Sequence, residues 1–196
     1  MLPSNLNIHR ARETDLTEMA RVYLSAFPGS NMTLEQVIER FRSNPQISLE
    51  EFWVCQRDCN LVGFFGIYNF QIYRNGKKIP TGGIGSVAVS AEARRDRIAH
   101  WMMLRAVEIM DQNNIPLSIL HPFRHSFYRH LGWGLTGKVH MYRFSPKSLL
   151  DYPERRQVSP VISTDDQEQV MSCYLKYARR NNGLVVRKDA QWYESI

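Results

Sequence analysis

The sequence has no long hydrophobic run. None of its apolar stretches approaches the roughly 18 residues that a membrane-spanning helix needs. Its first ten residues, MLPSNLNIHR, do not show the basic-then-apolar pattern of a secretory signal. These two absences predict a cytoplasmic protein that does not act on a membrane.

Cysteine is also scarce, with three residues at Cys55, Cys59 and Cys173. An odd number of cysteines argues against a disulfide framework. Cys55 and Cys59 stand close together, but no second pair of metal-ligating residues accompanies them, so the sequence predicts no metal site.

The glycine-rich phosphate-binding motifs are missing. Neither G-x-G-x-x-G nor G-K-[ST] occurs, which excludes the usual dinucleotide-binding turn and the P-loop. The net charge is nevertheless +6. A nucleic acid, an acidic membrane surface or a phosphorylated small molecule could each explain such a charge. Because there is no long basic run and no zinc-finger or RNA-recognition pattern, we predict no nucleic-acid partner.

The composition, 43% hydrophobic and 22% charged, is that of an ordinary globular protein. Periodicity predicts a first helix opened by the capping pair Asp15–Glu18 and a second opened by Thr33–Gln36. The dipeptide Asn75–Gly76 predicts a tight β-hairpin. The other expected elements are strands at 7–12, 51–56, 61–73, 117–120 and 133–144 and a helix at 98–112. This order predicts a mixed α/β sheet that closes by about residue 145.

The densest positive charge lies in the stretch VAVSAEARRDRIA, where Arg94, Arg95 and Arg97 separate an apolar strand from the helix that begins at Ile98. A helix N-terminus has free backbone N–H groups and partial positive charge, so phosphate binds there readily. Arginines at the helix entry add charge-assisted hydrogen bonds. The stretch is therefore a candidate pyrophosphate site, and the alternative is a solvated basic turn without a ligand.

The longer stretch VAVSAEARRDRIAHWMM resembles motif A of the GNAT superfamily of N-acetyltransferases, whose pattern is [RQ]-x-x-G-x-[GA]. Arg94 matches its first position and Ala99 its last, whereas Arg97 replaces the usual glycine. The resemblance implies acetyl-CoA as the cofactor. It also implies that the strand residues Val87, Ala88 and Val89 line the pantetheine arm, and that the turn residues hold the pyrophosphate: Arg94, Arg95, Asp96, Arg97, Ile98 and Ala99.

The chain is most similar to one branch, the enhanced-intracellular-survival type acetyltransferases. The similarity rests on the segments YRNGKKIPTGGIGSVAV and LSILHPFRHSFYRHLGWGLTG and on the tail YARRNNGLVVRKDAQWYESI. It implies a GNAT-like, mostly antiparallel twisted sheet flanked by helices. It further implies a GNAT acetyltransferase domain at residues 5–145, a linker at 146–160, and the beginning of a second, incomplete GNAT-like domain at 161–196.

In this family a tyrosine protonates the leaving thiolate, and the matching residue is Tyr128 in SFYRHLG. Its alternative role is that of a core tyrosine. We expect Phe27 and Phe123 on the side of the amine acceptor. His121, His125 and His130 are further candidates for a general base, because histidine titrates near neutral pH.

The resemblance predicts an acetyl-CoA-dependent N-acetyltransferase that acts on a primary amine of a small molecule, such as an aminoglycoside or a polyamine-like compound. The alternative is a non-catalytic acyl-CoA-binding or regulatory GNAT-like module, which the arginine at position 97 favours. A basic nucleic-acid-binding protein is a third hypothesis. The sequence is compatible with a homo-oligomer.

Overall fold

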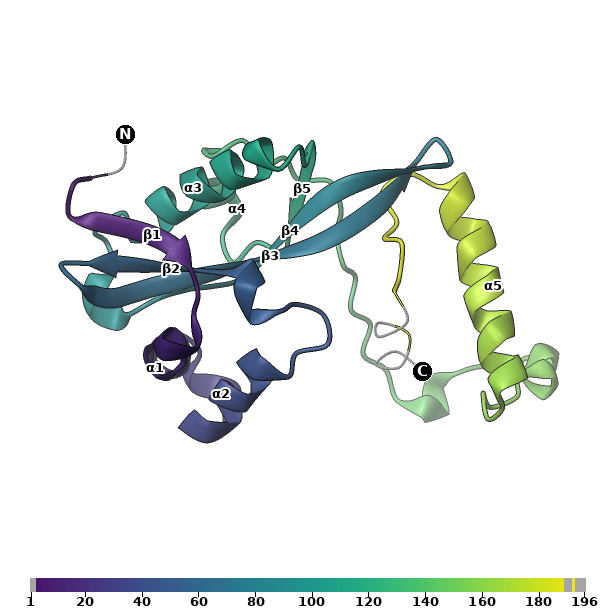
Figure 1. Cartoon of the computed structure of the whole chain (residues 1–196). Helices are drawn as coiled ribbons and strands as arrows, with labels where there is room; N and C mark the ends of the chain where they lie inside the picture. The colour runs from purple at the N-terminus through teal and green to yellow at the C-terminus, as the bar shows by residue number, and fades with distance from the viewer. Residues whose placement is uncertain (1–2, 189–191, 193–196) are drawn as a thin grey trace.

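The computed structural model describes residues 3–188 and 192. Its centre is a five-stranded sheet in the order β1-β2-β3-β4-β5 (Figure 1). Neighbouring strands are antiparallel except for β4 and β5, which run parallel. The strands are β1 Leu6–Arg10, β2 Phe52–Arg57, β3 Asn60–Arg74, β4 Lys77–Val89 and β5 Leu117–Leu120. This mixed, mostly antiparallel sheet confirms the predicted fold class.

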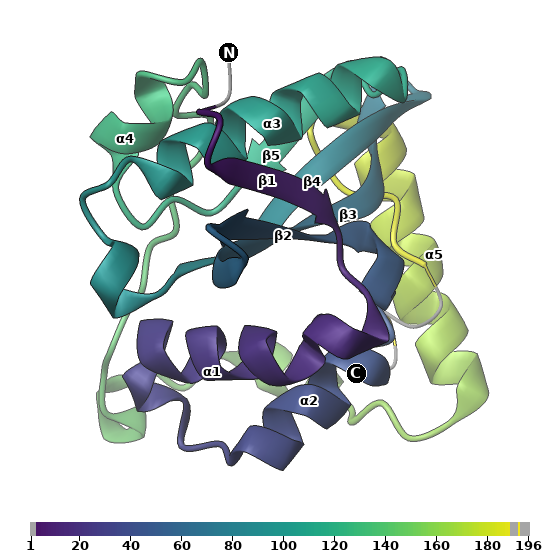
Figure 2. The ribbon, with the colours of Figure 1, turned by 60° about the vertical axis from the view of Figure 1, so that its left-hand side comes forward.

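Helices cover both faces of the sheet, as Figure 2 shows: α1 and α2 lie on one face, and α3 and α4 on the other. Each helical layer buries its own hydrophobic cluster against the strands. The α-helices of the described residues are α1 Leu16–Ala26, α2 Leu34–Arg42, α3 Ile98–Gln112, α4 His125–Arg129 and α5 Thr164–Arg180. Short 3-10 helices occur at η1 Glu13–Asp15, η2 Pro28–Ser30, η3 Leu49–Glu51, η4 Ala91–Ala93, η5 Pro146–Ser148 and η6 Pro153–Gln157.

One of the two predicted capping pairs is present. The Thr33 hydroxyl accepts from the Gln36 N–H at 3.3 Å, and the Gln36 side chain accepts from the Thr33 N–H at 2.8 Å. The pair Asp15–Glu18 was wrong: the Asp15 carboxylate caps η1 by accepting from the Arg12 N–H, and Glu18 pairs with Arg21. A short 3-10 turn, η1, precedes α1 and uses Asp15 as its own capping residue. The helical pattern of the sequence does not indicate such a turn.

The hairpin between β3 and β4 turns at Asn75 and Gly76, as predicted. Both residues have a left-handed backbone, with φ of 50° and 74°. This conformation gives the two-residue turn a twist that matches the strands, and asparagine and glycine adopt it most easily. The hairpin extends well beyond the end of β2, so the outer half of β3 has a free edge.

The C-terminal segment covers that free edge. After α5, the chain returns along β3: the Tyr73 N–H donates to Leu184 O at 2.9 Å and the Val186 N–H to Gln71 O at 2.8 Å. Arg187 lies over the rings of Tyr174 and Trp192, 4.5 and 4.7 Å from their centroids. Figure 1 shows α5 at the tip of the hairpin, away from α1 and α2.

The strand predicted at 133–144 is absent. These residues have no regular secondary structure, and apart from Trp133 they are exposed, Val139 by 85% and Met141 by 77%. Their β-forming composition is not sufficient, because a strand is stable only when another strand pairs with it. Trp133 alone is anchored, through its Nε1 donating to the Ser118 hydroxyl at 3.1 Å.

Candidate active site

The predicted site lies where β4 and β5 diverge. The ladder between them runs from Thr81–Leu117 to Ile84–Leu120 and ends there, while β4 continues to Val89. No strand of the described residues pairs with this edge of β4 from Gly85 onward. The opening therefore exposes backbone N–H and C=O groups to any ligand that enters between the strands.

A β-bulge causes the divergence. The register between β3 and β4 shifts between Phe64 and Gly66, and Ser86 on the opposite strand has a left-handed φ of 52°. A bulge bends its strand and strengthens its twist, which turns the end of β4 away from β5. The Ser86 hydroxyl lies 3.3 Å from the Tyr68 hydroxyl. Neither residue was predicted for the site, because nothing in the local sequence marks a left-handed serine.

The three predicted strand residues occupy this open segment. Val87 and Val89 pack against the hydrophobic cluster around α3, whereas Ala88 points to the opposite face and is buried in the cluster under α1. Because the side chains alternate across the sheet, the backbone of all three is left at the edge. Val87, Ala88 and Val89 thus lie on the part of β4 that β5 leaves open, and their contact with a cofactor stays a prediction.

The basic turn follows directly. Arg97 is the N-cap of α3, with φ 60° and ψ 16°, and Arg95 also has a positive φ of 74°. Arg97 therefore adopts the left-handed conformation that the glycine of the family pattern adopts at low cost. Its carbonyl accepts the first helical bond, from the Trp101 N–H. The preceding N–H groups, including those of Ile98 and Ala99, have no acceptor within the helix.

Two contacts tether this turn. The Arg94 guanidinium lies 3.5 Å from Ser25 O near the end of α1, and Asp96 forms an ion pair with Arg57 at 2.5 Å. Arg95 and Arg97 project their exposed side chains from the same turn. With free helical amides and two solvent-facing guanidinium groups, the turn suits a diphosphate.

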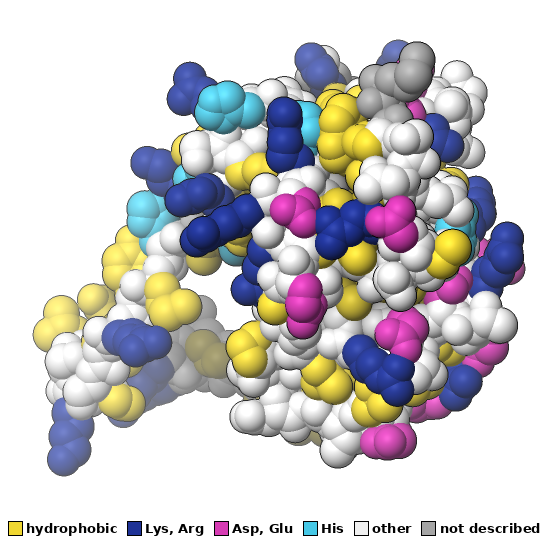
Figure 3. Space-filling model, turned by 90° about the vertical axis from the view of Figure 1, so that its left-hand side faces the viewer, with side chains coloured by type: hydrophobic (Ala, Val, Ile, Leu, Met, Phe, Trp, Pro, Cys, Tyr) yellow, Lys and Arg dark blue, Asp and Glu magenta, His cyan; other side chains and the backbone are white. Residues whose placement is uncertain are grey.

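Positive charge extends over this end of the molecule. Figure 3 faces it and shows Lys, Arg and His side chains gathered toward its upper left, whereas Asp and Glu lie mainly toward the right and below. Where Lys and Arg predominate on a surface, they attract a multiply charged anion before it docks.

Tyr128 lies in α4, and its side chain is 4% exposed. Three aromatic rings surround it at centroid distances of 5.0 Å for Phe127, 5.4 Å for Phe123 and 6.1 Å for Trp133. Burial raises the pKa of the Tyr128 phenol above its ordinary value. Its hydroxyl has no hydrogen-bond partner among the described residues, so this protonated group is available to donate.

Tyr128 belongs to the same hydrophobic cluster against which Val87 and Val89 pack, so α4 and the open segment of β4 share one core. The Phe123 ring meets the Tyr128 ring edge to face and is 71% exposed. Phe27 lies at the end of α1 against Tyr23, at 4.9 Å. No ring contact joins Phe27 to Phe123 in the described part of the chain.

The three candidate histidines are exposed. His130 Nδ1 lies 2.5 Å from Ser126 O within the same helical turn, so a local backbone contact occupies one ring nitrogen. Within residues 3–188 and 192, no group of three or more His, Cys, Asp or Glu side chains could hold a metal ion. None of the helices described is long and apolar enough to cross a membrane.

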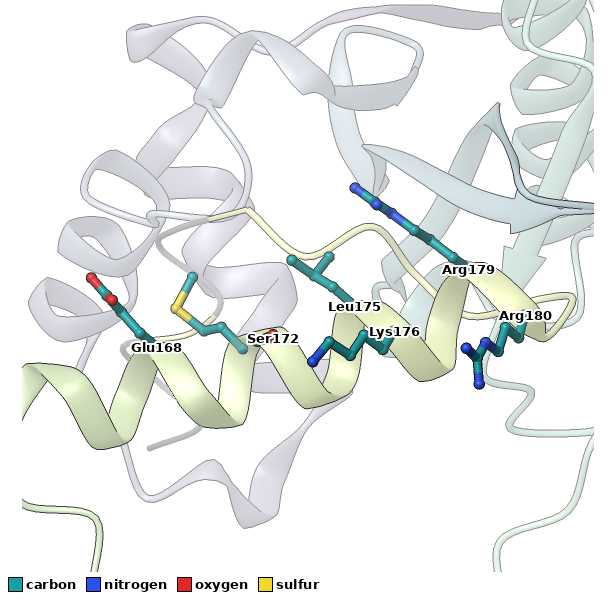
Figure 4. A pocket seen from close by; sticks show the side chains of 7 residues that line it. Glu168, Ser172, Leu175, Lys176, Arg179 and Arg180 are labelled. Carbon is teal, nitrogen blue, oxygen red and sulfur yellow. The ribbon is translucent and has the colours of Figure 1, made fainter.

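A separate hollow of about 530 Å³ runs along α5. Figure 4 shows that its side chains, from Glu168 to Arg180, all come from this one helix. None of the described residues that line it belongs to the predicted site. Its wide opening and single-helix lining distinguish it from the enclosed, convergent sites that usually hold small molecules.

Comparison with known protein families decides the assignment. Residues 7–136 match the family model described as an acetyltransferase (GNAT) domain. The chain belongs to the GNAT acetyltransferase family. The matched segment contains the bulge of β4, the basic turn and Tyr128. Acetyl-CoA is the usual co-substrate of this family. No curated protein matches the chain at a significant level.

Solved structures share the GNAT fold. A GCN5-related N-acetyltransferase from Anabaena variabilis superimposes with a TM-score of 0.72 at 18% identity, covering 96% of this chain and 47% of its own. One from Kribbella flavida gives 0.67 at 21% identity, covering 97% and 49%. This GNAT chain therefore spans about half the length of these two proteins. A GNAT acetyltransferase from Brucella melitensis in complex with acetyl-CoA gives 0.54 at 18% identity, covering 66% and 83%.

Proposed function

We propose that this chain is an acetyl-CoA-dependent N-acetyltransferase that acts on a primary amine of a small molecule. The observation that carries the proposal is a pair of neighbouring segments with available backbone donors. The first is the open edge of β4 after the Ser86 bulge, and the second is the first turn of α3. Membership of the GNAT family supports the same activity.

The residues present fit acetyl-CoA. The amides of Ile98 and Ala99, with the guanidinium groups of Arg95 and Arg97, would hold the pyrophosphate. The backbone of Val87 to Val89 would pair with the pantetheine arm as an added strand. When bound, acetyl-CoA supplies a thioester-activated acetyl group to the site.

The chain itself would contribute a proton donor, the Tyr128 phenol, and a backbone N–H dipole at or near Val89. Tyr128 keeps the proton on its phenol oxygen at neutral pH because the pKa of a phenol is near 10, and burial raises the pKa of Tyr128 further. It can transfer that proton to a thiolate as the thiolate leaves. A backbone N–H at Val89 or a neighbouring residue is a donor that can stabilise negative charge on a carbonyl oxygen. An amine that arrives deprotonated needs no strong base.

The acceptor side is aromatic. Phe27 and Phe123 both expose ring surface, which suits the alkyl and ring portions of an aminoglycoside or a polyamine-like amine. One structural neighbour is an aminoglycoside acetyltransferase, meta-AAC0020, with a TM-score of 0.54 and 16% identity. The sequence similarity to the enhanced-intracellular-survival branch supports the same class of acceptor.

The proposal includes the predicted location and organisation. The enzyme would work in the cytoplasm, with its acetyltransferase domain at 5–145, a linker at 146–160 and the beginning of a second GNAT-like unit at 161–196. The last segment packs on β3 through the Tyr73–Leu184 and Val186–Gln71 hydrogen bonds, so it would stabilise the first domain as well.

A non-catalytic acyl-CoA-binding module is the second candidate. It is favoured by Arg97, whose bulky side chain stands where the family pattern has glycine. The left-handed backbone of Arg97 leaves the helical amides beyond it available, so this candidate also requires cofactor binding.

Ligand-induced stabilisation tests both candidates. Because a ligand of the native state must raise the melting temperature, we expect coenzyme A and acetyl-CoA to do so. The variant Arg95→Ala/Arg97→Ala should lose most of the shift. Arg155→Ala/Arg156→Ala, in η6 on the linker, should retain it. The absence of a shift at millimolar coenzyme A in the wild-type protein would exclude both candidates.

A turnover measurement then distinguishes the N-acetyltransferase from the non-catalytic acyl-CoA-binding module. Release of free thiol from acetyl-CoA, measured with a panel of aminoglycosides and polyamines, should be amine-dependent for an enzyme. Binding without amine-dependent release across that panel would favour the non-catalytic module.

A further inference from the structure

The turn that precedes α3 contains a carboxylate, Asp96, between its two left-handed arginines. Asp96 lies among residues for which we propose a diphosphate site, and a carboxylate there repels the ligand. Its partner is Arg57, the last residue of β2, at an Nη1–Oδ2 distance of 2.5 Å. The two residues are 39 positions apart in the sequence.

We propose that Arg57 is a positioning residue for the cofactor turn. It neutralises the carboxylate of Asp96 and holds the turn in the left-handed shape that presents the α3 amides. This inference rests on the proposed function, because it assumes that the turn binds the diphosphate of coenzyme A.

The backbone of the turn needs such a restraint. Arg95 and Arg97, on either side of Asp96, have φ of 74° and 60°. A left-handed conformation costs a residue other than glycine about 1–2 kcal/mol, so surrounding contacts must maintain it. Among the described side-chain contacts, the Arg57 ion pair is the one made at the centre of the turn, and the longer Arg94–Ser25 contact holds its beginning.

Arg57 is itself well placed to act as an anchor. It pairs with Leu6 of β1 and with Asn60 of β3. The tight β2–β3 turn follows it, with Asp58 and Cys59 both left-handed, and the Asp58 N–H donates to Asn5 O. The Arg57 side chain is 29% exposed, compared with 47% for Asp96, so the guanidinium is the more buried partner of the pair.

A second ion pair provides a control. Arg42 of α2 binds Glu13 of η1 at the same distance of 2.5 Å, on the α1–α2 side and between residues that we place outside the cofactor site. Exposed ion pairs contribute little to stability. We therefore expect Arg57→Ala and Arg42→Ala to have similarly small effects on unfolding without ligand, and different effects on cofactor affinity.

The experiment measures the Kd of coenzyme A by calorimetry for the wild type, Arg57→Ala, Arg57→Lys, Asp96→Asn, the double variant Arg57→Ala/Asp96→Asn, and Arg42→Ala. We expect Arg57→Ala to weaken binding about tenfold, because it leaves Asp96 unneutralised beside the diphosphate. Arg57→Lys keeps the charge and should recover most of the affinity. Arg42→Ala should bind as the wild type does.

The double variant tests whether Arg57 affects cofactor binding through Asp96. If Arg57 acts through Asp96, the Arg57→Ala change should have a much smaller effect in the Asp96→Asn background than in the wild type. Equal losses in both backgrounds, or a Kd for Arg57→Ala equal to that of Arg42→Ala, would overturn the inference while leaving the proposed function intact. A wild-type protein that does not bind coenzyme A would overturn the proposed function as well.

Discussion

Tyr128 combines a largely buried ring with a hydroxyl that has no hydrogen-bond partner among the described residues. The phenol is protonated at neutral pH because its ordinary pKa is near 10, burial raises that pKa further, and the proton is available to donate. A structural core tyrosine would gain stability by bonding its hydroxyl. A hydroxyl that is open to solvent fits the acid role that we propose for Tyr128.

Tyr128→Phe tests that role. We expect amine-dependent thiol release to slow by about 100-fold, since loss of a positioned general acid costs that order. The Kd of coenzyme A should stay unchanged because the ring remains. Tyr177→Phe, at an exposed position of α5, is the matched control, and an equal rate for Tyr128→Phe would remove the acid role.

Arg97 shows strain at a single backbone position. Its φ of 60° favours glycine, so Arg97→Gly should raise the free energy of unfolding by about 1 kcal/mol in urea titrations without ligand. Arg94→Gly, where φ is −70°, should give no gain because glycine relieves nothing there. An unchanged or lower stability for Arg97→Gly would show that the turn does not strain this residue.

Single residues also show how far the sequence could predict the site. The arginine cluster, Tyr128 and Phe123 were recognisable from local motifs. Ser86, Tyr68 and Arg57 were not, because their roles arise from a bulge and from contacts between distant segments. Sequence periodicity contains no information on which of several arginines reaches a given carboxylate.

Secondary-structure elements were predicted well where local signals were strong. The helix at 98–112 agrees with α3, which ends before Pro116, and the Asn75–Gly76 hairpin has the expected turn. The strand at 133–144 was wrong because its stability depends on a neighbouring strand. Helices close their hydrogen bonds internally, whereas strands need partners, so helices are the more predictable from sequence.

The pairing of residues 183–186 with β3 leads to a prediction for these elements. Val186→Pro removes the N–H that donates to Gln71 O, and we expect α5 to detach more readily, with faster proteolysis between residues 164 and 188. Stability should fall by about 1–3 kcal/mol. Val161→Pro, before α5, is the control, and equal proteolysis of the two variants would show that this pairing does not hold α5 in place.

At the scale of the whole molecule, two buried acids link stability to pH. Burial raises the pKa of the Cys55 thiol from its ordinary 9 to about 11, and that of Tyr128 also rises. Both groups are more easily ionised in the unfolded chain. The contribution of Cys55 to stability is therefore complete below about pH 9 and is lost as the pH rises toward 11, and that of Tyr128 is lost only above its ordinary pKa of 10.

We expect the free energy of unfolding to fall by about 2–3 kcal/mol over that interval, most of it through Cys55. Cys55→Ala should be less stable at neutral pH because it leaves a cavity, yet its stability should decline less steeply between pH 9 and 10. Urea titrations at fixed pH values measure both slopes. Identical slopes would show that Cys55 does not carry the dependence.

The sequence by itself determined the family, the strand–turn–helix order of the cofactor segment and the identity of the acid candidate. These features depend on local motifs, and a local motif is present in the chain before it folds. Only the tertiary structure decided where β4 separates from β5, that Arg97 takes the left-handed backbone of a glycine, and that Arg57 neutralises Asp96. Each of these depends on contacts between segments far apart in the sequence, which exist only once the sheet has formed.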